Sequence, residues 1–132
     1  MLTDYHMYEK NNPFMAYNHI ELCQVSSKLS IVKVCLAPES KNLYGHVHGG
    51  LLYAMADCVA GVTARADGDE FVTQSAHINF LRNVQDGTIY AKAETVKRGR
   101  HMAVFHITIT DQNGDLLCDG VVDMFCSKKK AV

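Results

Sequence analysis

The distribution of hydrophobic and polar residues divides the chain into one strand, one long helix and four further strands. Leu29–Leu36 is rich in β-branched residues and ends before Pro38, which is typical of a strand. Gly49–Ala66 contains no proline and is apolar nearly all round, with Asp57 as the single charge before Arg65. Such a segment predicts a buried helix and not a surface helix with one polar face.

The rest of the chain has the character of strands separated by turns. The predicted strands are Phe71–Leu81, Thr88–Val96, His101–Thr110 and Leu116–Ser127. Asn113–Gly114 is a strong hairpin signal, and hairpins imply an antiparallel sheet, so we expect these four strands to form a meander. Near the N-terminus, Asn11–Pro13 predicts the start of a short helix through Tyr17. The order of elements predicts an α+β fold in which an antiparallel sheet wraps around one long buried helix.

Length and composition narrow the class of protein. A chain of 132 residues predicts a single domain over residues 1–132. Hydrophobic residues make up 48% and charged residues 20%, which excludes a disordered chain. The net charge of −1 gives no overall field to hold nucleic acid or an anionic membrane, and no apolar run reaches the roughly 18 residues that span a bilayer. The N-terminal residues lack the basic and apolar regions of a secretory signal, so we expect a cytoplasmic protein.

The cysteines and histidines do not suggest a cross-link or a metal. The five cysteines are an odd number without a C-x-x-C pair, which argues against a disulfide framework and a zinc knuckle. Cys35, Cys58 and Cys126 lie in apolar stretches and are expected to be buried free thiols. His46 and His48 could face the same way on a strand, but a metal site needs three or four ligands and no glutamate follows closely. We therefore predict no metal.

The segment between Asn42 and Asp57 combines three features suited to carbonyl chemistry. His48-Gly49-Gly50 stands where a loop becomes a helix, and a helix N-terminus presents unpaired N–H groups that glycines allow a ligand to approach. Such N–H groups can hold a carbonyl oxygen that becomes an oxyanion. Asp57 is one carboxylate on an apolar helix and a candidate base or nucleophile, while Asn42 can orient a water molecule or a carboxylate.

The spacing of Gly50 and Asp57 predicts that one copy of the chain is not enough. Seven residues separate them, so they lie on one helix face but about 10 Å apart along the axis. A base or nucleophile must come within about 3 Å of its target while the oxyanion donor touches the same carbonyl group. A two-fold dimer with antiparallel helices brings Gly50 of one copy to Asp57 of the other. We expect two shared sites per homodimer, and a dimer of dimers.

The motifs of this chain resemble those of a known family. The pattern N-x-x-G-x-x-H-G-G-x6-D is followed by Phe80-Leu81-Arg82 at a strand end and by Gly99-Arg100 before a later strand. With this pattern the chain resembles the hotdog-fold acyl-CoA thioesterases, and among them the PaaI-like (phenylacetate-pathway) branch. The resemblance covers roughly residues 29–127. It implies a hotdog fold and hydrolysis of an acyl-CoA thioester to a free acid and coenzyme A, with coenzyme A bound as part of the substrate and no separate cofactor.

The resemblance also implies roles for residues at matching positions. Gly50 matches the glycine whose N–H polarises the thioester carbonyl, and Asp57 matches the catalytic acid contributed by the partner subunit. Asn42 matches the residue that positions water or the thioester. His48 matches the histidine that shapes the glycine loop, and Thr73 falls where related enzymes often hold the attacking water with a Ser or Thr.

For the nucleotide end of coenzyme A, the family places basic residues at strand ends. The candidates in this chain, with the adjoining glycines of the substrate-binding loops, are Gly49, Arg82, Lys97, Arg98, Gly99 and Arg100. Asn83 stands where many relatives have proline, a departure that we expect to leave the catalytic pattern intact.

Two other functions stay open on the sequence. A hotdog hydratase or dehydratase of acyl thioesters pairs a histidine with the acid, and the nearby histidines here precede the glycines. A non-catalytic acyl-CoA-binding module could keep the pocket but would not need Asp57. The acyl group is left open among aromatic, hydroxylated and straight-chain types.

Overall fold

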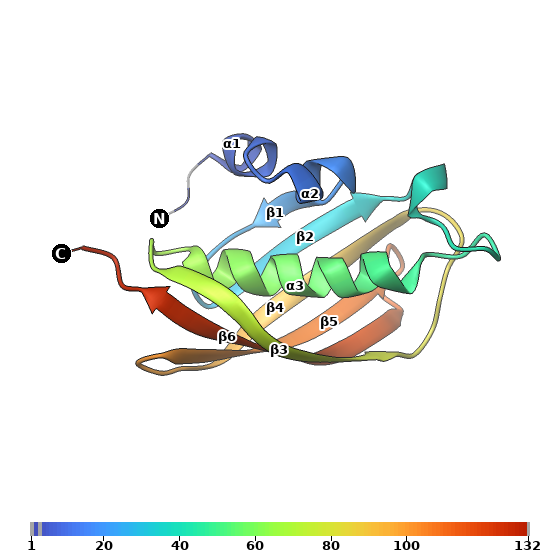
Figure 1. The fold of residues 1–132 in the computed structure, drawn as a ribbon. Coiled ribbons are helices and arrows are strands. Elements are labelled where there is room, and N and C mark those ends of the chain that lie inside the picture. Colours follow the sequence, from blue (N-terminus) through green and yellow to red (C-terminus); the bar gives the residue numbers. More distant parts are fainter. Residues whose placement is uncertain (1, 3, 132) are drawn as a thin grey trace.

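The computed structural model describes residues 2 and 4–131 and shows one long helix lying across a curved six-stranded sheet (Figure 1). In chain order the elements are α1 (Tyr5–Lys10), α2 (Pro13–Tyr17), β1 (Glu21–Gln24), β2 (Leu29–Cys35), a 3₁₀ turn (Pro38–Ser40), α3 (Gly49–Arg65), β3 (Glu70–Phe80), β4 (Thr88–Arg98), β5 (Met102–Asp111) and β6 (Leu116–Lys128). The predicted long helix and the five predicted strands are all present, with ends within a few residues of those expected.

The sheet order differs from the expected meander. The strands run β1-β2-β4-β5-β6-β3, and every neighbouring pair is antiparallel. The meander is correct for β4, β5 and β6 but wrong for β3, which lies at the far edge beside β6. The reason is that the chain after β3 does not turn back on itself, because the N–H groups of Leu81 and Arg82 both donate to the carbonyl of Leu117, at 2.8 and 3.1 Å.

Two short elements at the N-terminus were not expected from the sequence. They are α1, whose N-cap Asp4 accepts the N–H of Met7 at 2.9 Å, and β1, which pairs with β2 at the other sheet edge. The predicted α2 is present, with Pro13 in its first turn and the Asn12 side chain as its cap. Figure 1 shows α1 and α2 beside β1, at the edge of the sheet away from β3.

The core lies between α3 and the concave face of the sheet. The inward residues of β4 and β5 are fully buried, as are those of α3 that face them; they include Leu52, Met55, Val59, Ala91, Ala93, Phe105, Ile107 and Ile109. Gly120 of β6 allows the closest approach in the sheet, because a Cβ atom there would collide with the carbonyl oxygen of His77 on β3. No helix in the described part of the chain is long and apolar enough to cross a membrane.

One face of α3 is left uncovered by the chain's own sheet. Gly50 and Tyr53 are exposed, and Ala54, Asp57 and Cys58 are half-buried along the same side. A helix that is apolar all round is stable when it is covered on every side, and this chain covers one side of α3 only. The prediction of a wholly buried helix is thus met on the sheet side alone.

The cysteines are free, and one of them departs from its expected burial. Cys126 is buried and Cys58 is half-buried, but Cys35 is exposed. The prediction for Cys35 is wrong because buried and less buried residues alternate along β2, and Cys35 ends the strand on the outer face.

Candidate active site

The N-terminus of α3 is built by a loop that backbone hydrogen bonds hold tightly. Lys41 and Val47 form an isolated β-bridge, and the N–H of His48 donates to the carbonyl of Ser40 at 2.9 Å. His48 is the N-cap of α3, and its Nδ1 accepts the N–H of Gly50 at 2.8 Å. The predicted oxyanion donor is therefore present at the helix start, and in this structure it is occupied by the side chain of its own cap.

Asn42 stabilises the tip of the same loop. Its Oδ1 accepts the N–H of Tyr44 at 2.8 Å and the N–H of His46 at 3.1 Å. These bonds use the oxygen of the amide, and Asn42 lines a hollow together with Gly49.

Asn83 has a positioning role that the sequence did not suggest. Its Nδ2 donates to the carbonyl of Val47 at 2.9 Å and its Oδ1 accepts the N–H of Val47 at 3.2 Å. This pair of bonds fixes the residue directly before His48. Asn83, which stands where many relatives have proline, thus stabilises the loop that precedes the glycines in a way that proline could not, because proline has no side-chain amide to make these bonds.

Asp57 and Thr73 meet on the open side of α3. The Oγ1 of Thr73, on β3, donates to Oδ1 of Asp57 at 2.5 Å. Two predicted site residues that are 16 positions apart are brought into direct contact. Beside them, burial, and to a smaller extent the charge of Asp57, raises the pKa of the Cys58 thiol to about 12, so Cys58 is a neutral neighbour and not a nucleophile near neutral pH.

Two hollows open on either side of the glycine pair. One, of about 280 Å³, is lined by Gly50, His48, Leu51 and residues of α2 and the 3₁₀ turn. The other, of about 350 Å³, is lined by Gly49, Asn42, Phe80 and Arg82. Gly50 and Gly49 thus face different spaces at the helix start, and a ligand can reach either.

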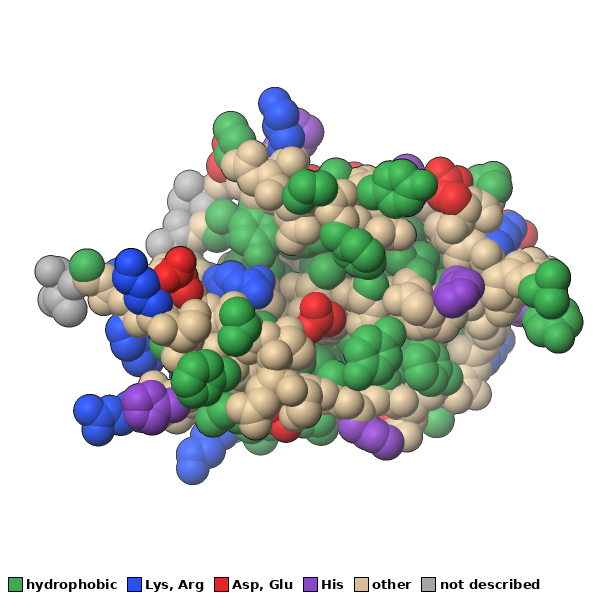
Figure 2. Space-filling model, viewed as in Figure 1, with side chains coloured by type: hydrophobic (Ala, Val, Ile, Leu, Met, Phe, Trp, Pro, Cys, Tyr) green, Lys and Arg blue, Asp and Glu red, His purple; other side chains and the backbone are tan. Residues whose placement is uncertain are grey.

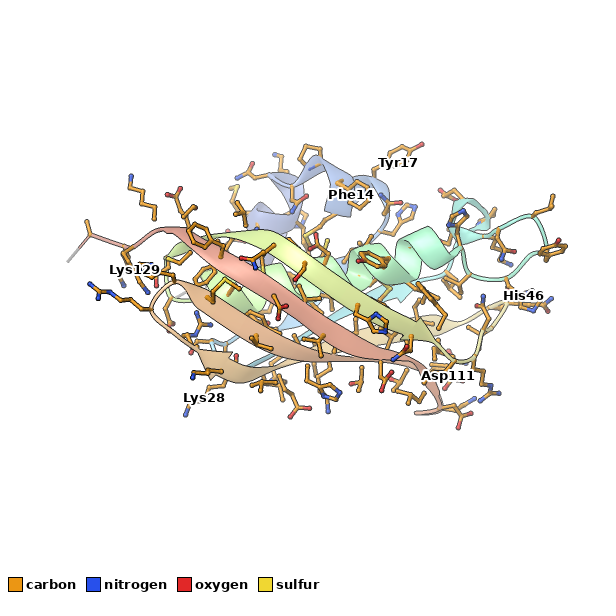
Figure 3. All side chains as sticks on the ribbon, turned by 60° about the horizontal axis from the view of Figure 1, so that its bottom comes forward. Phe14, Tyr17, Lys28, His46, Asp111 and Lys129 are labelled. Carbon is orange, nitrogen blue, oxygen red and sulfur yellow. The ribbon has the colours of Figure 1, made fainter. Side chains whose placement is uncertain are left out.

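The predicted basic residues lie at opposite ends of the molecule. Arg82 is near the start of α3 and pairs with Asp115 at 2.8 Å, an ion pair that raises the pKa of Arg82. Lys97 lies at the other end, near the end of β4, and Gly99 and Arg100 follow in the β4–β5 turn, where the Gly99 N–H donates to the carbonyl of Met102. Figure 3 shows how far apart these ends lie, with His46 at the first and Lys28 and Lys129 at the second.

Arg98 belongs to the second end but serves the helix terminus. Its guanidinium donates to the carbonyls of Ser27, Thr63 and Ala64 at 3.1 to 3.2 Å and lies over the rings of Phe71 and Phe105. Two of these carbonyls are in the last turn of α3, where a cation is stabilising. Arg98 therefore holds the end of α3 in place, and its guanidinium has fewer free N–H donors for coenzyme A.

Sequence reasoning missed Arg65 and the tie it makes across the open side of α3. Its Nε and Nη2 donate to the carbonyl of Phe71, and its Nη1 donates to the hydroxyl of Tyr8. The available signal was a lone arginine in the last turn of an apolar helix.

Within residues 2 and 4–131, no group of three or more His, Cys, Asp or Glu could hold a metal ion.

Comparison with known proteins identifies the family. The model of the Thioesterase superfamily matches residues 44–118, which include the glycine pair, Asp57 and Thr73. The chain belongs to the thioesterase superfamily. The hotdog fold expected from the sequence is confirmed, with the corrected position of β3, and so is the thioester hydrolase.

Relatives of this superfamily support the same conclusion. The 1,4-dihydroxy-2-naphthoyl-CoA hydrolase of Listeria monocytogenes is 28% identical over 114 residues, which cover 84% of this chain and 93% of that protein. A hypothetical thioesterase of Streptococcus pneumoniae, solved with coenzyme A, is 28% identical with a TM-score of 0.84, covering 93% of this chain and 99% of that one. A thioesterase of Haemophilus influenzae has a TM-score of 0.88 at 19% identity, covering 97% and 93% of the two chains, which shows the shared fold. The acyl-CoA thioesterase activity predicted for this chain is thereby confirmed as the activity of its family.

Proposed function

We propose that two copies of this chain form a shared acyl-CoA thioesterase site, in which the Gly50 N–H of one copy polarises the thioester carbonyl and Asp57 of the other acts on it. The observation that carries this assignment is the hydrogen bond between Asp57 and Thr73 on the open side of α3. A carboxylate bonded to a hydroxyl is suited to hold and activate a water molecule, or to attack the carbonyl itself.

Two variant structures of the Streptococcus pneumoniae thioesterase add support. In one an aspartate is replaced by alanine and in the other a threonine, and these two residues are 16 positions apart, as Asp57 and Thr73 are here. At 27% identity, the equal spacing supports the same pair in this chain.

The surface around α3 supports the two-fold pairing. Apolar side chains gather over α3 and β3 in Figure 2, and Tyr53, Val72, Phe80 and Leu81 are exposed there. β3 is an edge strand whose second side has no strand partner among the described residues. An exposed apolar face next to an unpaired edge is a surface that a second copy of the chain would cover. The dimer of dimers predicted from the sequence stays a prediction.

The same pairing supports a site for coenzyme A. Antiparallel helices bring the start of one α3 to the end of the other, so Arg82 of one copy approaches Lys97 and Arg100 of the facing copy. In a single chain these residues are at opposite ends, so the dimer assembles a basic edge that the monomer lacks.

The partners of Asp57 favour hydrolysis over the alternative hydratase. Within one chain, Asp57 bonds to the hydroxyl of Thr73 and the imidazole of His48 bonds to the backbone of Gly50, so each group already has a partner other than a histidine–acid pair. We assign the chain to the PaaI-like branch on its H-G-G-x6-D pattern, acting without a metal or separate cofactor. A cytoplasmic location remains our proposal from its cysteine content.

The test is thiol release from a broad panel of acyl-CoA substrates, followed by size measurement in solution. We expect hydrolysis by a dimer or larger assembly. Mixing inactive Asp57→Asn chains with inactive Gly50→Val chains should restore part of the activity, because one of the two sites in a mixed dimer keeps both functional groups. Absence of thiol release from every substrate would overturn the proposed function, and a monomer with full activity would overturn the shared site.

A further inference from the structure

A cavity beside the end of α3 is lined by an arginine without a carboxylate partner among the described residues. The cavity has a volume of about 650 Å³, within the range of small-molecule sites, and Leu2, Met7, Tyr8 and Pro13 supply its apolar walls. Arg65 of α3 is the basic residue of its lining. Among residues 2 and 4–131, no carboxylate oxygen lies within 4.0 Å of its guanidinium. Asp4 also lines the cavity, but its carboxylate caps α1 through the N–H of Met7.

The guanidinium of Arg65 is held in a fixed position. Gly61 leaves the room for it, since a Cβ atom there would lie 2.6 Å from Nη1. The carbonyl of Phe71 and the hydroxyl of Tyr8 accept three of its hydrogen bonds. An arginine has five N–H donors, so two remain for the two oxygens of a carboxylate.

Two independent counts place this guanidinium close to the catalytic pair. Along α3, Gly61 is four residues beyond Asp57, which is about 6 Å. Along β3, Phe71 is two residues before Thr73, which is about 7 Å. If the two helices are antiparallel and Gly50 of one copy faces Asp57 of the other, Arg65, eight residues beyond Asp57, lies opposite Asn42, eight residues before Gly50. The Asn42 loop of the facing copy would then close the cavity.

We propose that Arg65 binds an anionic group at the far end of the acyl chain, so that the enzyme prefers acyl-CoA substrates that end in a carboxylate. The inference rests on the proposed function, because it uses the position of Asp57 and Thr73. A chain of about five carbons spans the distance from the thioester carbonyl to the guanidinium, at about 1.5 Å per bond. The phosphates of coenzyme A are about a dozen bonds from the sulfur, too far in an extended arm to reach this position.

The test compares two substrates of the same shape. Glutaryl-CoA ends in a carboxylate, and 5-methylhexanoyl-CoA has two methyl groups in place of the two carboxylate oxygens. We expect the wild-type kcat/KM to favour glutaryl-CoA at least tenfold. Arg65→Met should lower kcat/KM for glutaryl-CoA on the order of 10- to 100-fold, the value of a charge-assisted hydrogen bond, and change the neutral substrate less than about threefold. Arg65→Lys should restore part of the preference.

A second variant keeps the test valid if Arg65→Met unfolds the protein, since Arg65 ties α3 to α1 and β3. Gly61→Ala retains the charge but displaces the guanidinium, and it should reduce the same substrate ratio while the melting temperature is kept. A parallel fall for both substrates, or no wild-type preference for glutaryl-CoA, would overturn the inference while leaving the thioesterase in place. A weaker affinity for free coenzyme A in Arg65→Met would assign the anion to its phosphates and overturn it as well. If no substrate releases thiol, the proposed function itself fails.

Discussion

The two halves of α3 supply different kinds of chemistry by different means. At its start the reactive group is a backbone N–H, and the loop that aims it is held mainly by residues close together in the sequence, such as Asn42 and His48, with Asn83 as a more distant support. From its middle onward the groups are side chains, and they are held by residues far away in the sequence, such as Thr73 and Tyr8. A local pattern can therefore be found in the sequence, whereas contacts between distant segments depend on the sheet order.

The largest effect is expected at the middle of the helix. Asp57→Asn keeps the shape of the side chain but removes the charge, so kcat should fall about 10³-fold or more, as for loss of a base or nucleophile. Thiol release from the best acyl-CoA of the panel measures it, and an unchanged melting temperature is the control. Retention of most of the activity would remove Asp57 from the mechanism.

The start of the helix should respond next. The Cβ atom in Gly50→Ala would lie 2.9 Å from Nδ1 of His48, so the imidazole must move and the approach to the N–H narrows. We expect kcat/KM to fall about 10²-fold, the size found for loss of one oxyanion donor.

A double-mutant cycle with His48→Ala shows whether the displaced cap is the cause. If it is, Gly50→Ala has a smaller effect in the His48→Ala background. Equal effects in both backgrounds would mean that the methyl group itself blocks the substrate.

The hydrogen bond between Thr73 and Asp57 is tested by two matched substitutions of Thr73. Thr73→Val removes the hydroxyl that donates to Asp57, and we expect a fall in kcat of about tenfold or more. Thr73→Ser keeps the hydroxyl and should retain most of the rate. If both variants behave alike, the packing of the side chain matters and its hydrogen bond does not.

At the end of the helix the effect should move from activity to stability. Arg98→Met removes three hydrogen bonds to carbonyl groups, two of them in the last turn of α3, so the free energy of unfolding should fall by roughly 1 to 3 kcal/mol. The KM for acyl-CoA should change less than it does in Arg100→Met, since Arg100 is exposed in the adjacent turn. A larger rise of KM in Arg98→Met would return Arg98 to the coenzyme A site.

The smallest effect is a change of stability in alkaline solution. Burial raises the pKa of Cys58 to about 12 from an ordinary value of 9.0. Below pH 9 the thiol is neutral in both states, and above it the unfolded chain ionises first, so the free energy of unfolding should decline as pH rises from about 9 to about 12. Urea unfolding of Cys58→Ala should show a shallower decline than the wild type, and identical slopes would contradict the burial of this thiol.

The sequence predicted the elements better than their arrangement. The long helix, five strands and the α+β class follow from periodicity and turn residues, and the glycine loop follows from a pattern of adjacent residues. The position of β3 could not be predicted, because it depends on the bonds of Leu81 and Arg82 to Leu117, a contact across the sheet. For the same reason the sequence indicated Thr73 only through the family resemblance and did not indicate Asn83 or Arg65.

The cap on α3 has a consequence for how the site distinguishes two forms of the substrate. The Gly50 N–H already donates to an imidazole nitrogen, a better acceptor than the oxygen of a neutral thioester. Exchanging one acceptor for the other gains nothing while the substrate is merely bound. When the carbonyl oxygen becomes negatively charged it outcompetes the imidazole, so this donor favours the transition state and contributes little to the affinity for the substrate.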